Sequence, residues 1–117
     1  MGVEIVEASK DKVIGKLKVE PGLCTTGGTL HGGASMAFAD SLGAIAGFLA
    51  LPEGATGTTT LESKTNFLGA AKQGTIITGE TTPVHRGRRT SVWQTKITGE
   101  DGKAVALIIQ TQMALGV

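Results

Sequence analysis

The sequence is poor in aromatic residues, in cysteine and in excess charge. Phe, Trp and Tyr together make up 3% of the 117 residues, and Cys24 is the single cysteine. A core of stacked aromatic rings and an intrachain disulfide are therefore excluded, and a lone thiol is typical of the reducing cytosol. The formal net charge of +1 gives no general attraction to nucleic acid or to an anionic membrane. We expect a cytoplasmic protein that binds neither.

Patterns typical of a secretory signal, a membrane span or a metal site are also lacking. Glu4 and Glu7 interrupt the short apolar stretch near the start. The longer apolar stretch at 34–51 contains Asp40 and glycines, so it does not predict a membrane span. The two histidines and the one cysteine lie far apart, without the spacing of metal ligands. We expect no metal and no cofactor.

Glycine, in contrast, is abundant, with 18 residues. It allows close backbone packing but brings no side chain to bury. A chain of this length with so little bulk buries a limited apolar surface by itself. The composition therefore predicts a single domain over residues 1–117 that associates with further copies of itself.

Alternating apolar and polar residues predict strands on both sides of one central apolar segment. The turns between them are indicated by Pro21–Gly22, by 9–11 and by the run Gly99-Glu100-Asp101-Gly102. The last strand is nearly continuously apolar, as in a strand that is covered on both faces. The expected strands are 3–8, 12–20, 57–68, 75–84, 90–98 and 104–115.

The central segment, 33–51, predicts a helix. It is rich in alanine, leucine and other small or apolar residues, it has few β-branched residues, and Pro52 follows it. A helix of roughly 18 residues is about 27 Å long. Because apolar residues lie on nearly all its sides, we expect it to be buried. One antiparallel sheet curled around this helix would bury it, which makes the fold class α+β.

The most informative motif stands at the start of this helix. His31-Gly32-Gly33 opens it, and Asp40 follows nine positions after His31. In this motif the chain resembles the hotdog-fold acyl-CoA thioesterases, in particular the phenylacetate-pathway and 4-hydroxybenzoyl-CoA thioesterase branch. The resemblance runs from Leu23 onward and includes Gly87-Arg88-Arg89 and Val92-Trp93.

The resemblance implies a fold, an activity and an assembly. The fold is the hotdog fold, with one sheet wrapped around a long helix. The activity is hydrolysis of an aromatic or medium-chain acyl-CoA, in which coenzyme A is part of the substrate rather than a cofactor. The assembly is a homodimer, with two dimers forming a homotetramer.

The glycines of the motif have a role on physical grounds as well. Free N–H groups and the positive end of the dipole at a helix start favour a developing oxyanion. The resemblance implies that the Gly32 N–H holds the thioester carbonyl oxygen beside Gly33. It also implies that His31 steadies this carbonyl or the departing sulfur. The alternatives are a structural imidazole at His31 and ordinary turn glycines.

Asp40 is an acid about two turns into an otherwise apolar helix. An unpaired buried carboxylate is costly, so Asp40 needs a function or a partner. The resemblance implies that it attacks the thioester or activates water, facing the His31–Gly32 pair of the other subunit. The alternative is a buried structural hydrogen bond.

Five further residues are candidates around this acid. Thr60 matches a position that holds a hydroxyl for water or substrate in relatives, although threonine is also a good strand former. Ser41 is a possible helper. Thr25 stands where relatives commonly have Asn or Gln. Phe38, with Leu42, is expected to line a tunnel for the acyl group.

The second candidate region is the turn that contains Arg86, Gly87, Arg88, Arg89 and Thr90. Guanidinium groups bind phosphate oxygens in pairs, and coenzyme A carries a diphosphate and a 3′-phosphate. The resemblance implies that this turn binds the nucleotide. The alternative is a solvated basic hairpin.

Two other functions remain as rivals. One is a hotdog enoyl-thioester hydratase or dehydratase, which also uses a histidine and an acid but in different motifs. The other is a non-catalytic acyl-CoA-binding module, which we would expect to lack the Asp40 carboxylate.

Overall fold

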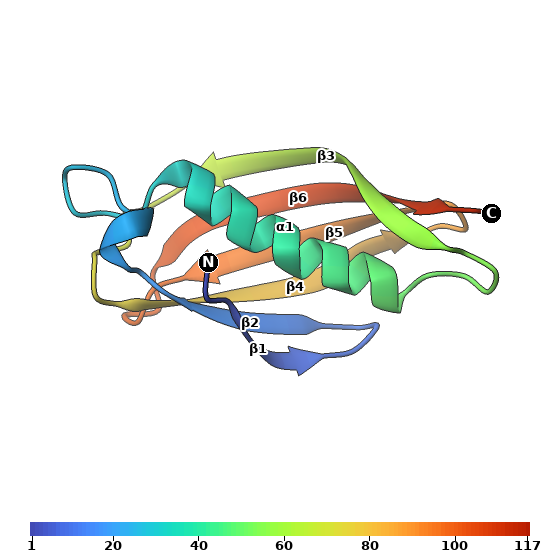
Figure 1. Ribbon diagram of the computed structural model, residues 1–117, viewed down its shortest axis with the longest axis horizontal. Coiled ribbons are helices and arrows are strands. Elements are labelled where there is room, and N and C mark those ends of the chain that lie inside the picture. The colour runs from blue at the N-terminus through green and yellow to red at the C-terminus, as the bar shows by residue number, and fades with distance from the viewer.

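One antiparallel sheet of six strands carries one long helix on one of its faces, as Figure 1 shows for the computed structural model of residues 1–117. The strands follow the order β1-β2-β4-β5-β6-β3 across the sheet. Their bounds are β1 Glu4–Ala8, β2 Val13–Lys18, β3 Gly57–Phe67, β4 Ile76–Arg86, β5 Thr90–Thr98 and β6 Ala104–Leu115. All six strands were predicted from the sequence within a few residues at each end.

The helix, α1, covers Gly32–Leu49 and has the predicted length of 18 residues. A short 3-10 helix, η1, at Pro21–Leu23 precedes it. Ala50 ends α1 two residues before Pro52, which cannot continue a helix. The expected α+β class, with one antiparallel sheet and one long helix, is confirmed.

The core lies between the sheet and one side of α1. Phe38 and Leu42 are fully buried there. Two glycines that face each other across β2 and β4, Gly15 and Gly79, leave room for them. A Cβ at Gly15 would lie 2.7 Å from Leu42 Cδ2, and one at Gly79 would lie 2.6 Å from Leu42 Cδ1. The close approach of helix and sheet therefore depends on the absence of side chains at this pair.

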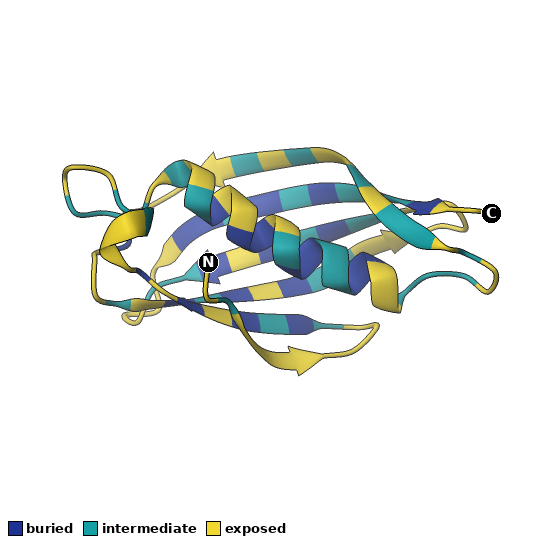
Figure 2. Ribbon diagram, viewed as in Figure 1, coloured by how far each residue is buried: buried dark blue, intermediate teal, exposed yellow.

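The other side of α1 is open in the single chain, as the yellow bands along the helix in Figure 2 show. Met36 is 39% exposed and Phe48 is 61% exposed. The prediction of a helix buried all round is thus wrong for one chain, because the sheet covers one face of α1 only. The buried helix residues are Ser35, Phe38, Ala39, Leu42, Gly43, Ala46 and Gly47.

The last strand, β6, shows the same one-sided covering. Buried and half-buried residues alternate along it from Ala106 to Ala114, so α1 covers one face and no element covers the other. The expectation that β6 is covered on both faces is therefore wrong for one chain.

By length and composition alone α1 could cross a membrane, with a mean hydropathy of 1.2 over 18 residues. In this structure 39% of that window is buried inside the protein. The core helix of a globular domain passes the same test.

The two edges of the sheet differ. At one edge, β1 has five residues, all exposed. At the other, β3 has eleven residues and pairs with β6, with a register shift of the β-bulge type between Thr60 and Glu62. Beyond this bulge Ser63 pairs with Gln110, whereas before it Thr60 pairs with Gln112. Residues 60 and 63 thus both face α1 despite their odd spacing.

Candidate active site

His31 caps the N-terminus of α1. Its Nδ1 accepts a hydrogen bond of 2.9 Å from the Gly33 N–H, and its carbonyl accepts from Ala34 and Ser35. The Gly32 N–H has no partner within the chain. An imidazole that accepts at Nδ1 carries its proton at Nε2, so the exposed His31 presents an Nε2–H donor.

Gly32 also packs closely against the end of β3. A Cβ at this position would lie 3.0 Å from the ring of Phe67, which ends β3. Gly32 and Phe67 line one surface hollow together with Leu30, Ser35 and Leu68. The free N–H of Gly32 thus belongs to a residue at the wall of a hollow that is partly apolar.

The loop before α1 is held by its own hydrogen bonds. The His31 N–H donates to the Leu23 carbonyl at 2.8 Å, which closes the loop. Thr25 Oγ1 lies 3.3 Å from the Thr29 carbonyl and 3.4 Å from Thr29 Oγ1. The Thr25 hydroxyl therefore stabilises the loop, and in the single chain it contacts neither His31 nor Asp40.

Asp40 lies on the exposed side of α1, where Thr60 and Gln110 reach its carboxylate. Thr60 Oγ1 donates to Asp40 Oδ1 at 2.9 Å, and Gln110 Nε2 donates to the same oxygen at 3.0 Å. Gln112 Nε2 in turn donates to Thr60 Oγ1 at 2.7 Å. We call Asp40, Thr60, Gln110 and Gln112 the Asp40 cluster. Oδ2 of Asp40 has no hydrogen-bond partner within the chain.

This arrangement corrects one expectation and brings two candidates together. Asp40 is exposed in the single chain, so the burial expected for an acid in an apolar helix is absent. Asp40 and Thr60, twenty residues apart, are in direct contact. Gln110 and Gln112 were not predicted as site residues, although two glutamines within the apolar run of β6 were a usable signal.

His31 and Asp40 do not meet within one chain. They lie nine positions apart, His31 at the N-cap of α1 and Asp40 within it, which corresponds to about 13 Å along the helix axis. No side chain of the Asp40 cluster forms a hydrogen bond with the N-terminus of α1. The His31–Gly32 half and the Asp40 half of the predicted site are thus both present in one chain, but they do not contact each other.

Two other candidates have structural contacts instead. Ser41 Oγ donates to the Ala37 carbonyl one turn earlier in α1, at 3.0 Å. Phe38 is 0% exposed and packs on the sheet, on the buried side of α1. Phe38 and Leu42 are core residues in this chain, and their predicted place along an acyl tunnel is not supported.

The arginine turn, Arg86–Thr90, connects β4 and β5, and its first arginine is engaged within the chain. Arg86 Nη2 forms an ion pair of 2.7 Å with Asp11 Oδ1, and its guanidinium lies 5.8 Å from the centroid of the Trp93 ring. The hydrogen bond from Arg86 lowers the pKa of Asp11. Arg86 is therefore paired with Asp11 in the single chain, and its role in binding phosphate stays a prediction.

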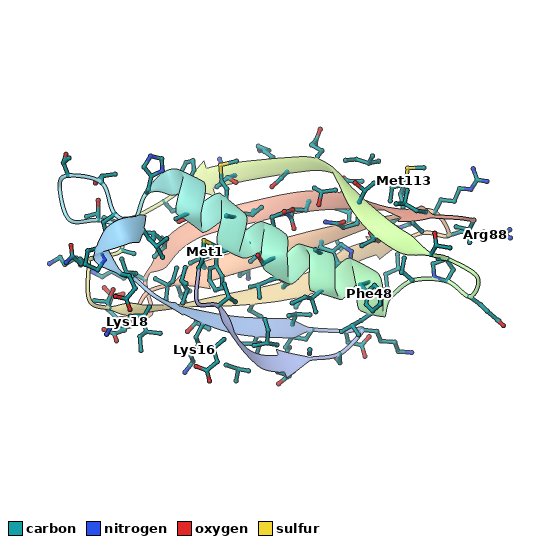
Figure 3. The ribbon with its side chains drawn as sticks, viewed as in Figure 1. Met1, Lys16, Lys18, Phe48, Arg88 and Met113 are labelled. Atoms are coloured by element: carbon teal, nitrogen blue, oxygen red, sulfur yellow. The ribbon has the colours of Figure 1, made fainter.

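The remaining arginines of the turn are free. Arg88 and Arg89 are exposed and have no ion pair within the chain. The turn is tight, because the Gly87 N–H donates to the Thr90 carbonyl at 2.8 Å and a Cβ at Gly87 would lie 2.8 Å from that oxygen. It borders the C-terminal end of α1 and lies at the end of the molecule opposite His31, where Figure 3 labels Arg88.

No group of three His, Cys, Asp or Glu side chains is placed to hold a metal ion in this structure. The chemistry that the arrangement offers is that of an oriented carboxylate, a free helix-start N–H and a cluster of exposed guanidinium groups.

The chain matches a known protein family and a curated relative. The family model of the thioesterase superfamily matches residues 27–106. A 1,4-dihydroxy-2-naphthoyl-CoA hydrolase from Escherichia coli is 41% identical over 76 residues. That segment is 65% of this chain and 54% of the hydrolase, so the match spans about half the length of this relative.

Two solved structures match nearly the whole chain. A thioesterase from Haemophilus influenzae has a TM-score of 0.90 and 31% identity, covering 98% of this chain and 79% of that one. A thioesterase protein from Streptococcus pneumoniae, solved with coenzyme A, has a TM-score of 0.89 and 28% identity, covering 98% of this chain and 90% of that one. The chain belongs to the thioesterase superfamily: it is a hotdog-fold thioester hydrolase.

Proposed function

We propose that this chain hydrolyses the thioester of an acyl-coenzyme A and that Asp40 supplies the reacting carboxylate. The observation that carries the proposal is the pair of hydrogen bonds to Asp40. Thr60 and Gln110 hold Oδ1, while Oδ2 is without a partner on the open side of α1. A carboxylate that is oriented but not paired with a cation suits a general base or a nucleophile.

The reaction adds water across the bond between carbonyl carbon and sulfur. Oδ2 either adds to the carbonyl carbon or takes a proton from the attacking water. In both routes the C–S bond breaks and coenzyme A leaves as a thiolate that takes up a proton. When Oδ2 adds, an anhydride forms between Asp40 and the acyl group, and water then cleaves this anhydride to release the free acid and restore the carboxylate. When Oδ2 acts as a base, the water oxygen itself bonds to the carbonyl carbon. Both routes place negative charge on the carbonyl oxygen. The Gly32 N–H and the His31 Nε2–H are suitable donors for this charge or for the departing sulfur.

The active site in this proposal lies between two copies of the chain. The separation of about 13 Å between His31 and Asp40 along α1 prevents them from acting on one carbonyl group within one chain. The open side of α1 also exposes Met36 and Phe48, apolar side chains that a second copy would cover. His31 and Gly32 of one copy would then face Asp40 of the other.

The substrate in this proposal is an aromatic or medium-chain acyl-CoA. The curated relative acts on an aromatic acyl-CoA, by its name, and a related structure contains coenzyme A. Arg88 and Arg89, exposed and without acidic partners, suit the phosphates of coenzyme A, with Thr90 beside them. Arg86 holds Asp11 and is not included.

Mixing two inactive variants tests the shared site. Asp40→Asn removes the carboxylate charge. His31→Asn removes the Nε2–H but keeps a residue that caps helices well. Neither variant should hydrolyse acyl-CoA efficiently by itself. After unfolding and refolding together in equal amounts, the mixture should recover about a quarter of the wild-type rate, because half of the dimers are mixed and each has one complete site of two.

Free thiol released from a panel of acyl-CoA thioesters measures the rate. Each variant refolded alone is the control for recovery of the fold. A mixture that stays as inactive as its components would contradict a site shared between copies. A wild-type chain that binds acyl-CoA without releasing thiol would contradict hydrolysis altogether.

A further inference from the structure

Two glutamines of β6 lie behind the Asp40 carboxylate, and they are the least expected residues of the core. Gln110 and Gln112 are each 1% exposed. A buried amide is costly unless its donors and acceptors are paired. Apolar residues at these two positions would fill the same space without that cost, so their amides need another explanation.

The hydrogen bonds of the two amides run in one direction. The Thr58 hydroxyl lies 3.2 Å from the Met113 carbonyl and 3.3 Å from Gln112 Oε1, the two acceptors that share its one hydrogen, and Gln112 Nε2 donates to Thr60 Oγ1. Thr60 Oγ1 then donates its single hydrogen to Asp40, where the second donor is Gln110 Nε2. Because an ionised carboxylate can only accept, each donor in this series points toward Asp40.

Two glycines of α1 make room for these amides. Gly43 and Gly47 follow Asp40 at three and seven positions, on the same stripe of the helix. A Cβ at Gly43 would overlap Oε1 of Gln110, and one at Gly47 would lie 3.1 Å from Cγ of Gln112. Side chains at these helix positions would push the glutamines out of place.

The orientation of Gln110 leaves one of its own atoms unpaired. Gln110 Oε1 is buried without a hydrogen-bond partner. Turning the amide around would place this oxygen against the Asp40 carboxylate, where two acceptors repel. The unpaired Oε1 is therefore the consequence of aiming Nε2 at Asp40.

We propose that Gln110 and Gln112 are positioning residues for Asp40, Gln110 by direct contact and Gln112 through Thr60. Together they fix Oδ1 and leave Oδ2 to react. Gly43 is part of the same device, because it admits the Gln110 amide. This inference rests on the proposed hydrolysis of acyl-CoA and adds the residues that orient its carboxylate.

Replacing Gln110 by methionine tests the direct contact, because it keeps the size of the side chain and removes the donor. We expect kcat to fall roughly 10- to 100-fold while KM stays within about twofold, since a misplaced reacting group affects the chemical step rather than binding. Thermal unfolding should show a chain that remains folded. Gln94→Met, on the other face of the sheet in β5, is the matched control and should leave kcat unchanged.

Gly43→Ala tests the same device from the helix. Its methyl group would displace the end of a flexible side chain rather than backbone. We expect Gly43→Ala to lower kcat as Gln110→Met does. In a chain that already carries Gln110→Ala, Gly43→Ala should cause no further loss, because the group it displaces is gone. Losses that simply multiply would contradict the proposed role of Gly43.

Failure of the inference and failure of the proposed function give different results. If the wild type hydrolyses acyl-CoA and Gln110→Met keeps the full kcat, the inference is wrong and the function stands. If the wild type hydrolyses no acyl-CoA, the function is wrong. Crystal structures of the wild type and of Gln110→Met then test the positioning role. We expect the Asp40 carboxylate to move in the variant, and an unchanged Asp40 side chain would refute the role.

Discussion

The Asp40 cluster and the arginine turn are the two polar regions that the sequence singles out, and they are built in different ways. In the Asp40 cluster, Thr60 and Gln110 donate to one exposed carboxylate at 2.9 and 3.0 Å, and Gln112 donates to Thr60 at 2.7 Å. In the arginine turn, Arg88 and Arg89 extend from a tight backbone with no partner. The first region fixes the position of Asp40 Oδ1, as a reacting carboxylate requires. The second supplies positive charge, which is enough to bind the phosphates of a flexible ligand.

The largest effect should follow from Asp40→Asn, which keeps the shape of the cluster and removes its charge. We expect kcat for acyl-CoA hydrolysis to fall about 10²- to 10⁴-fold, the usual contribution of a general base. Ser41→Ala is the control at the adjacent position, because the Ser41 hydroxyl bonds only the helix backbone. Thiol release by both variants measures the difference. Equal rates in the two variants would mean that the Asp40 carboxylate contributes no more to hydrolysis than the Ser41 hydroxyl.

A smaller effect, on binding alone, should follow from removing both free arginines of the turn. In the chain with Arg88→Ala and Arg89→Ala, we expect KM for acyl-CoA to rise about tenfold with kcat unchanged, because charge-assisted contacts to phosphate are lost. With an acyl-pantetheine substrate, which lacks the nucleotide, variant and wild type should behave alike. A difference that persists with that substrate would assign the arginines another role.

The smallest effect concerns the third arginine. Arg86 lowers the pKa of Asp11 from 3.8, so the ion pair stabilises the folded state above this pH and is lost as the pH falls through the lowered value. Since Asp11 is exposed, the wild type should unfold at a slightly higher temperature than Asp11→Asn near neutral pH. The two melting temperatures should converge as the pH falls below the lowered pKa of Asp11. A difference that does not depend on pH would mean that the ion pair is not its source.

Much of the fold could be predicted from the sequence, because periodicity and turn residues are local signals. The alternation in 12–20 and the mostly apolar segment before Pro52 determine β2 and α1 directly. The side of α1 that meets the sheet could not be predicted, since apolar residues lie all around it. Phe38 was therefore expected near the acyl group, although the glycine pair on β2 and β4 draws it into the core.

The site shows the same division between local and long-range information. His31, Gly32 and Asp40 are recognisable from one short segment. The pairing of Arg86 with Asp11 spans 75 residues and depends on where the β1–β2 turn meets the end of β4, which no local pattern shows. The contacts of Gln110 and Gln112 likewise depend on the register of β6 against β3 and on two helix glycines.

The bulge in β3 separates the two halves of this strand in register. Thr60 lies before it, and the stretch from Ser63 to Phe67 that runs toward Gly32 lies after it. A gain or loss of one residue normally turns every later side chain of a strand to the opposite face. Here the extra residue is taken up at the bulge, so both halves of β3 keep a face toward α1, with Thr60 beside Asp40 and Phe67 beside Gly32.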